Sequence, residues 1–143
     1  MNAFNLRILE ADSIFYEGDC VSLIVPTQSG AFGVLAGHAN EIAAIVPGEV
    51  KFKVRESEEF KVASISRGII KIEGPDVLIL ADSVEDINEI DVNRARREAE
   101  RAREILRKKS SLREFLLART QLDRSMNRMK LHNKYYNEDN FDF

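Results

Sequence analysis

The sequence has no tryptophan, one cysteine, and no glycine or proline after residue 75 of its 143 residues. Glycine and proline are the residues that most often end helices and form turns, so the last 68 residues are compatible with long uninterrupted helices. All seven glycines and all three prolines lie in the first 75 residues. The chain therefore divides into a turn-rich first part and a helix-compatible second part, with the boundary near residue 87.

Three further features limit the class of protein. A single cysteine, Cys20, excludes an internal disulfide and suits a reducing compartment, and its place in a strand-like pattern favours a packing role. No segment approaches the ~18 consecutive apolar residues of a membrane-spanning helix. Residues 1–7 lack the basic start and apolar block of a signal peptide. We expect a cytosolic location.

The charge is divided at nearly the same place as the glycines and prolines. Residues 1–86 carry 7 Lys or Arg and 14 Asp or Glu, a net charge of −7, and residues 94–128 carry 12 basic and 5 acidic side chains, a net charge of +7. The remaining positions supply −3, which gives the overall net charge of −3. Such asymmetry usually relates to the partners that a protein binds.

The first part has the pattern of short β-strands. Apolar residues alternate with polar ones in residues 4–8, 21–25 and 50–54, which is the period of a half-buried strand. Further apolar segments, at 60–62, 70–72 and 77–80, are separated by turns rich in Gly, Pro and Asp. Many short strands with frequent turns favour an antiparallel sandwich or barrel, and the absence of helical spacing between them disfavours a parallel βαβ sheet.

Residues 26–40 form a longer connection that contains Gly30, Gly33 and Gly37. No lysine follows at the spacing of a phosphate-binding P-loop, so that motif is excluded. His38 has no accompanying acid and nucleophile that would make it a catalytic base. Two interpretations remain: two tight turns at the edge of a sandwich, or a surface loop that contacts a partner.

The second part predicts two helices joined by a short connection. Asp91 is placed to cap the first helix, with Ile90 packing on Ala95, and Ser111 begins a capping box for the second. The first helix has a stripe of small and apolar residues, namely Ala95, Ala99, Ala102 and Leu106. The second has an apolar face made of Leu112, Phe115, Leu116, Leu122, Met126 and Met129. These patterns predict an antiparallel hairpin with alanines against leucines.

Four arginines have the spacing to converge at one end of this hairpin. Arg94 and Arg101 share a face of the first helix, and Arg124 and Arg128 share a face of the second. Gathered guanidinium groups repel one another unless an anion neutralises them, and phosphate oxygens match their geometry. The alternative is a solvated face on which Glu98, Glu100 and Glu104 pair with arginines of their own helix.

A nucleic-acid partner is disfavoured. Glutamates are interleaved with the arginines, and Phe115 is the sole aromatic residue of the two predicted helices, so there is no platform for base stacking. The acidic first part would also repel a phosphate backbone.

The motifs, taken in order, resemble the family of bacterial F-type ATP synthase epsilon subunits. They are Gly37-His38-Ala39, the segment LILADS at residues 78–83, the segment IDVNRA at residues 90–95, and the Arg/Ala-rich hairpin. The resemblance covers residues 4–132. It implies a non-catalytic rotor subunit whose sandwich lies at the foot of the central stalk, between the gamma subunit and the ring of c subunits.

On this resemblance, Gly33, Gly37 and His38 face the c-subunit ring. The family's loop usually reads Pro-Gly-His-Ala-Pro, and Ala36 and Asn40 stand here in place of the two prolines. The chain is then expected at the cytoplasmic face of the cell membrane as a peripheral part of the complex, attached to the membrane through its partners.

The resemblance also implies that the hairpin moves. Folded on the sandwich it permits rotation, and extended along gamma it reaches the alpha and beta subunits of the catalytic head and inhibits ATP hydrolysis. Some members bind ATP in the folded form. The matching positions are Glu85, Ile90, Asp91, Arg94, Ala95, Arg101, Arg124 and Arg128. ATP is thus an expected regulatory ligand, and no cofactor or metal is required.

The sequence therefore predicts an α+β protein: an antiparallel β-sandwich over residues 1–86, an antiparallel helical hairpin over 87–134, and a disordered tail over 135–143. The predicted function is that of a non-enzymatic subunit that couples proton flow to ATP synthesis and restrains ATP hydrolysis. The second interpretation is an adaptor that presents a basic helical hairpin to an acidic partner, and an enzyme ranks third.

Overall fold

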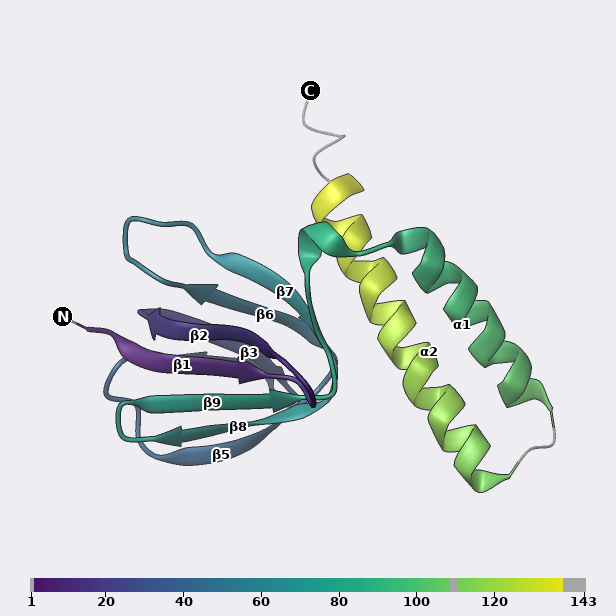
Figure 1. Cartoon of the computed structure of the whole chain (residues 1–143), viewed down its shortest axis with the longest axis horizontal. Helices are drawn as coiled ribbons and strands as arrows, with labels where there is room; N and C mark the ends of the chain where they lie inside the picture. Colours follow the sequence, from purple (N-terminus) through teal and green to yellow (C-terminus); the bar gives the residue numbers. More distant parts are fainter. Residues whose placement is uncertain (1, 109–110, 138–143) are drawn as a thin grey trace. The chain divides into compact units, whose positions relative to one another are not determined.

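The computed structural model describes residues 2–108 and 111–137. For residue 137 it describes the backbone alone. The chain forms two compact units that divide between Asp86 and Ile87. In Figure 1 the first unit consists of β-strands and the second of two long helices.

The first unit is a sandwich of two five-stranded sheets. One sheet has the strand order β2-β1-β9-β8-β5 and the other the order β10-β7-β6-β3-β4. The strands are β1 (Phe4–Leu9), β2 (Ile14–Cys20), β3 (Ser22–Thr27), β4 (Gly30–Val34), β5 (Glu41–Ile45), β6 (Gly48–Lys53), β7 (Lys61–Ile65), β8 (Gly68–Glu73), β9 (Asp76–Ala81) and β10 (Val84–Asp86). The predicted α+β fold, a sandwich followed by a helical hairpin, is confirmed.

One strand pairing departs from the antiparallel pattern. β1 and β9 run parallel, from Asn5 opposite Asp76 to Leu9 opposite Leu80. The other pairings within the two sheets are antiparallel. A parallel pair needs a long connection, and here the whole of the intervening sandwich supplies it. Local strand patterns carry no information about a pairing between the first and the ninth strand.

The core lies between the two sheets and is made of alternate residues of the strands. Leu6 and Ile8 of β1, Leu23 of β3, Ile65 of β7 and Ile79 of β9 are completely buried, as the period of two requires.

Cys20 ends β2 and belongs to the same core. Its side chain is completely buried, and its thiol donates a hydrogen bond to the carbonyl oxygen of Ser22 over 3.1 Å. Burial raises the pKa of the Cys20 thiol, which keeps it protonated and unreactive. The packing role predicted for this cysteine is confirmed.

Four strands lie outside the apolar segments identified from the sequence, namely β2, β4, β5 and β10. β2, β4 and β5 each have several exposed residues. All four are edge strands, β2 and β5 of one sheet and β4 and β10 of the other. Edge strands gain their structure from backbone pairing on one side, so their side chains show a weaker pattern than those of central strands.

The connection at residues 26–40 is more regular than the sequence indicated. It contains β4, which pairs with β3 from Leu23 opposite Val34 to Thr27 opposite Gly30. A tight turn precedes this strand at residues 27–30, and a second follows it where the His38 N–H donates to the Leu35 carbonyl. The interpretation as two tight turns at a sandwich edge is therefore confirmed, with a strand between them.

The second unit is an antiparallel helical hairpin. A short 3-10 turn (Ile87–Glu89) precedes α1 (Val92–Arg107), and α2 (Leu112–His132) continues into a π-helical turn (Asn133–Asn137). Both predicted caps are present: the Asp91 carboxylate accepts from the Arg94 N–H over 3.0 Å, and the Ser111 hydroxyl accepts from the Glu114 N–H over 3.2 Å. These bonds satisfy amide groups that have no partner within their helices.

The contact between the helices differs from the predicted one. Ala95, Ala99 and Ala102 of α1 are buried as expected, but the buried residues of α2 are Ala118, Ser125 and Leu131. The predicted apolar face of α2 is largely exposed, and Leu112, for example, is 73% exposed. The prediction of alanines against leucines was wrong because small residues on both helices let the two backbones approach closely. Most large side chains of α2 then lie outside that line of contact, and Leu131 near the end of the helix is the buried exception.

Some sequence-based expectations lie at the limits of the described residues. Lys109 and Ser110, which belong to the connection between the helices, lie outside them. The predicted tail starts at residue 135, and its first three residues belong to the π-helical turn. Residues 138–143 lie outside the described residues.

Candidate functional site

The start of α1 holds four of the predicted nucleotide-binding positions: Ile90, Asp91, Arg94 and Ala95. Asp91 is the N-cap residue and is exposed, whereas Ile90 and Ala95 on either side of it are buried. The capping bond uses Asp91 Oδ1, so this carboxylate has a structural role in the absence of any ligand. The helix starts here because the cap residue has extended backbone geometry and its side chain reaches the free amide.

Glu98, in the second turn of α1, connects two of the four predicted arginines. Its Oε1 atom accepts from Arg94 Nε over 3.0 Å, and its Oε2 atom accepts from Arg128 Nη1 of α2 over 3.3 Å. Arg94 is one turn before Glu98 on the same helix, and Arg128 lies near the end of the opposite helix. The predicted convergence across the hairpin therefore holds for Arg94 and Arg128, and a carboxylate of the chain itself lies between them.

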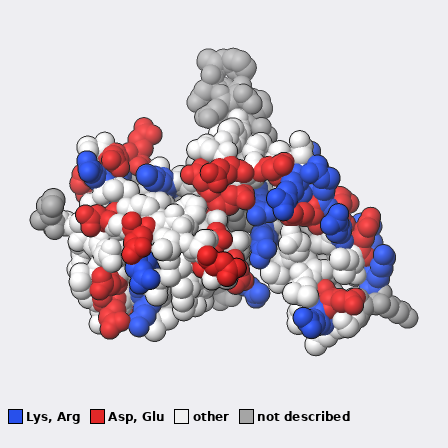
Figure 2. All heavy atoms as spheres, in the orientation of Figure 1, with Lys and Arg blue, Asp and Glu red and all other residues white. Residues whose placement is uncertain are grey.

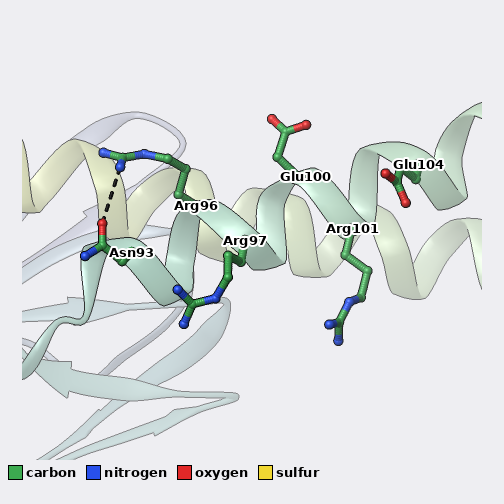
Figure 3. Close-up of a pocket in the computed structure, with 6 residues that line it drawn as sticks. All are labelled: Asn93, Arg96, Arg97, Glu100, Arg101 and Glu104. Carbon is green, nitrogen blue, oxygen red and sulfur yellow. Dashed lines mark hydrogen bonds between the residues drawn. The ribbon is translucent and has the colours of Figure 1, made fainter.

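Arg101 lines two depressions of the hairpin. One is a hollow of about 580 Å³ along α1 whose lining is drawn in Figure 3: Asn93, Arg96, Arg97, Glu100, Arg101 and Glu104. In this view Arg97 and Arg101 extend on one side of the helix and Glu100 on the other. The second depression is a groove of about 560 Å³ between the helices, which Arg101 lines together with Glu98 and Gln121. Arg101 thus shares a groove with the carboxylate that binds Arg94 and Arg128.

Arg124 is half-buried on α2, one turn before Arg128. Its Nε atom is buried and has no hydrogen-bond partner among the described residues. No described contact joins Arg124 to Glu98, so the structure does not gather all four arginines on one group. A buried N–H without a partner is costly, and a ligand that accepted a hydrogen bond there would remove the cost.

Glu85 is the remaining predicted nucleotide position. It lies in β10 of the sandwich, opposite Ser64 of β7, and its side chain is half-buried. It therefore belongs to the first unit, whereas the other seven positions belong to the second.

The arginine-rich surface also contains the glutamates expected under the alternative interpretation. On the face shown in Figure 2, basic side chains gather over α1 with acidic ones among them. Arg103 donates to Glu100 over 2.7 Å on the same helix, as Arg94 does to Glu98. Pairing within α1 thus accounts for part of the surface, but it does not account for Arg128, which comes from α2.

The predicted ring-contact residues lie at the edge of the sandwich. Gly33 is exposed in β4, and Gly37 is exposed in the turn that follows, where its φ of +80° favours glycine. The His38 ring packs edge-on against Phe32 with 5.3 Å between ring centroids, and its Nδ1 atom lies 2.8 Å from the Ala39 carbonyl oxygen. Gly33 and Gly37 are therefore exposed at the edge of the sandwich, and the half-buried His38 lies in the turn beside Gly37.

Within residues 2–108 and 111–137, no group of three or more His, Cys, Asp or Glu side chains has the arrangement of a metal site. None of the described helices is long and apolar enough to cross a membrane.

Two residues of the site were missed in the sequence. Gln121 Nε2 donates to Glu98 Oε2 over 2.9 Å and to Ser125 Oγ over 3.2 Å, and Ser125 is completely buried between the helices. A serine seven residues after Ala118 is the available signal, because that spacing places both on one face of α2. Glu98 itself was anticipated, but only as a partner within its own helix.

Comparison with known proteins identifies both units. A family model described as the beta-sandwich domain of the ATP synthase delta/epsilon chain matches residues 3–87, and a model described as its long alpha-helix domain matches residues 88–132. An ATP synthase epsilon chain of Ruminococcus albus is 44% identical over 135 residues, which cover 94% of this chain and 99% of that protein. One of Caldanaerobacter subterraneus subsp. tengcongensis is 35% identical over 132 residues, covering 92% of this chain and 95% of that protein.

The fold is also found in solved structures. A chain in the cryo-EM structure of the Euglena gracilis mitochondrial ATP synthase, OSCP/F1/c-ring in rotational state 1, superposes with a TM-score of 0.71. The match covers 87% of this chain and 78% of that chain at 20% sequence identity, so the likeness concerns the fold.

Proposed function

Because this chain belongs to the ATP synthase epsilon chain family and is a non-catalytic subunit of the central stalk, we propose that its sandwich couples proton flow to ATP synthesis and that its hairpin restrains ATP hydrolysis. The observation that carries this division of roles is the separation of the chain into two compact units. A unit with its own core can remain bound to the rotor while the other changes its contacts.

The sandwich is the proposed attachment to the rest of the rotor. Its partners would be the gamma subunit and the ring of c subunits, with Gly33, Gly37 and His38 at the ring contact. The support is the exposure of Gly33 in β4 and of Gly37 in the following turn. The chain would then lie at the cytoplasmic face of the cell membrane, held there by its partners.

The hairpin is the proposed inhibitory element. Folded on the sandwich it would permit rotation, and extended along gamma it would contact the alpha and beta subunits of the catalytic head. The support is the nature of its own contact, in which small residues such as Ala99 and Ser125 are buried and large ones such as Leu112 and Leu116 stay exposed. An exposed apolar surface on a basic helix pair is suited to binding another protein surface.

A truncated chain that ends at Asp86 tests this division. It keeps β10 and the whole sandwich, so it should fold, assemble with the enzyme and support ATP synthesis. ATP hydrolysis by the same enzyme should rise to the uninhibited rate. If the truncated subunit still restrains hydrolysis as the full chain does, the hairpin is not the inhibitory element.

We further propose ATP as the regulatory ligand of the folded hairpin, bound by Glu85, Ile90, Asp91, Arg94, Ala95, Arg101, Arg124 and Arg128. The support is the approach of Arg94 and Arg128 from opposite helices and the buried Nε atom of Arg124. A ligand that binds one state stabilises it by RT ln(1 + [ATP]/Kd), or roughly 2.7 kcal/mol at a hundredfold excess over Kd. This free energy would shift an even equilibrium to about 100:1.

Calorimetric titration of the full chain with ATP tests the ligand. Arg101→Ala is the most informative variant, because Arg101 is exposed and has no ion pair among the described residues, so its loss leaves the hairpin intact. We expect binding by the wild type and a loss of roughly tenfold or more in the variant, as removal of a charge-assisted phosphate contact implies. Arg113→Ala, at the opposite end of the hairpin, is the control and should bind normally. The absence of heat in the wild type at millimolar ATP would remove ATP as the ligand.

A further inference from the structure

Among the residues that the structure describes, Glu98 joins three side chains of the hairpin. Its two oxygens accept hydrogen bonds from Arg94 Nε at 3.0 Å, Arg128 Nη1 at 3.3 Å and Gln121 Nε2 at 2.9 Å. The side chains of Glu98 and Arg128 are only 24% and 19% exposed. This group differs from the surface ion pairs of the chain because it joins two helices and is partly removed from water.

The position of Glu98 is fixed by the contact between the helices. Gln121, which donates to Glu98 Oε2, also donates to the hydroxyl of Ser125. Ser125 is completely buried, as is Ala99, the residue after Glu98. The carboxylate is therefore held by a buried network as well as by charge, and it stays beside the arginines when no ligand is present.

A carboxylate in this place uses the donors that a phosphate group would use. Each guanidinium has five N–H groups, and Arg94 and Arg128 each direct one of them to Glu98. Arg101 lines the same groove as Glu98 and Gln121. An anion entering this groove meets the negative charge of Glu98 in its lining, and the two must compete for the arginines.

We propose that Glu98 is the internal counter-ion of the arginine cluster and that it lowers the affinity of the cluster for polyphosphate. This inference rests on the proposed binding of ATP to the hairpin and names the residue that limits its affinity. Glu98 neutralises Arg94 and Arg128 in the ligand-free hairpin, and a polyphosphate must displace it from at least one of them. The carboxylate thereby keeps the hairpin together without ligand and sets the ATP concentration at which the ligand binds.

Glu98→Gln separates this role from a purely structural one. Glutamine has the size of glutamate and an oxygen that still accepts from the arginines, but it carries no charge. Glu100→Gln is the matched control: it removes the same charge two residues away, where Glu100 is exposed and pairs with Arg103 on its own helix. Damage to the hairpin would weaken ligand binding, whereas removal of a competing charge strengthens it.

The experiment is a calorimetric titration of the full-length wild type and both variants with ATP and with inorganic triphosphate. We expect Glu98→Gln to bind both ligands about fivefold more tightly than the wild type, which corresponds to about 1 kcal/mol. Glu100→Gln should remain within about twofold of the wild type. If both variants bind the ligands more tightly by the same factor, the effect comes from net charge and not from the position of Glu98. That result would overturn the proposal. Unchanged or weaker binding in Glu98→Gln would overturn it as well.

A second measurement without ligand separates failure of this inference from failure of the ATP site. Thermal unfolding of Glu98→Gln, Arg128→Gln and the double variant gives the coupling between the two side chains. We expect the two single changes to be less than additive in the double variant. Additivity would mean that the contact does not form in solution, and it would overturn the role of Glu98 whatever ATP does. If the two side chains are coupled but neither the wild type nor any variant binds ATP or triphosphate, the proposed ATP site is wrong. The proposed competition is then wrong as well.

Discussion

The sandwich and the hairpin are each stabilised internally by a different kind of contact. In the sandwich the largest completely buried side chains are leucine, isoleucine and valine from both sheets, whereas in the described part of the hairpin the completely buried residues are small, namely Ala95, Ala99 and Ser125. The hairpin relies on alanines that permit close approach, on two helix caps, and on the network around Glu98. Buried apolar area is the main source of stability, so the sandwich is built to stay folded and the hairpin to change its contacts at a small free-energy cost.

The largest expected effect is a loss of core volume in the sandwich. Leu6→Ala removes a completely buried side chain of β1 and should lower the free energy of unfolding by about 3–5 kcal/mol. Leu80→Ala removes the same atoms from a 42% exposed position of β9 in the same sheet and should cost about 1 kcal/mol or less. Chemical denaturation of the two variants measures the difference. Equal losses would show that the core does not dominate the stability of the sandwich.

An enlarged residue in the contact between the helices should have the next largest effect. Ala99→Leu places three extra carbon atoms where α1 is completely buried, and overpacking of this kind costs about 1–3 kcal/mol. Hydrogen exchange should accelerate in α1 and α2 and stay unchanged in the sandwich. Glu104→Leu, at an exposed position of α1, is the control and should leave the exchange rates of both units as they are. Slower exchange in Ala99→Leu would mean that the two helices are not in close contact.

Loss of one helix cap should have a moderate effect. Ser111→Ala leaves the Glu114 N–H without its partner and should destabilise the hairpin by about 1 kcal/mol. Ser111→Asp keeps an oxygen in the same place and should restore the stability. Helix content as a function of temperature, measured by circular dichroism, compares the three proteins. No difference between alanine and aspartate would show that the cap contributes nothing.

The smallest expected effect concerns an exposed ion pair of the sandwich. Arg7 and Glu17 face one another on β1 and β2 with 3.9 Å between their charged atoms, and both side chains are about half exposed. Arg7→Gln should change the unfolding free energy by less than about 0.5 kcal/mol, with the residual effect absent at 1 M salt. A loss above 1 kcal/mol in denaturant titrations would place this pair among the stabilising contacts of the sandwich.

The sequence predicted those parts of the molecule in which local patterns determine the structure. Alternation identified the central strands, and Asp91 and Ser111 identified the starts of both helices. Edge strands such as β4 were missed because their structure comes from backbone pairing, which leaves little trace in the side chains. The parallel β1–β9 pair was missed because it joins distant segments.

The sequence predicted which arginines approach one another in the candidate site, but it did not predict the contacts between the two helices that position them. Spacing placed Arg94 and Arg128 at the same end of an antiparallel hairpin, and the structure brings both to Glu98. Which face of α2 meets α1 was beyond prediction, because a row of small residues at Ala118 and Ser125 competes with a more conspicuous row of large ones. The close approach that small residues permit determines which face of α2 meets α1. The same face brings Gln121 into contact with Glu98.

The parallel pairing of β1 with β9 sets the order of events while the chain is being synthesised. Leu6 lies opposite Val77, 71 residues later (77 − 6), so the first strand leaves the ribosome long before its second neighbour exists. At about 5–20 residues per second this interval lasts roughly 4–14 s, during which β1 can pair with β2 alone. The helices, in contrast, form contacts close in sequence that arise quickly once α2 has emerged. The nascent sandwich thus spends most of its synthesis with an unpaired strand edge, and it closes only as translation reaches the hairpin.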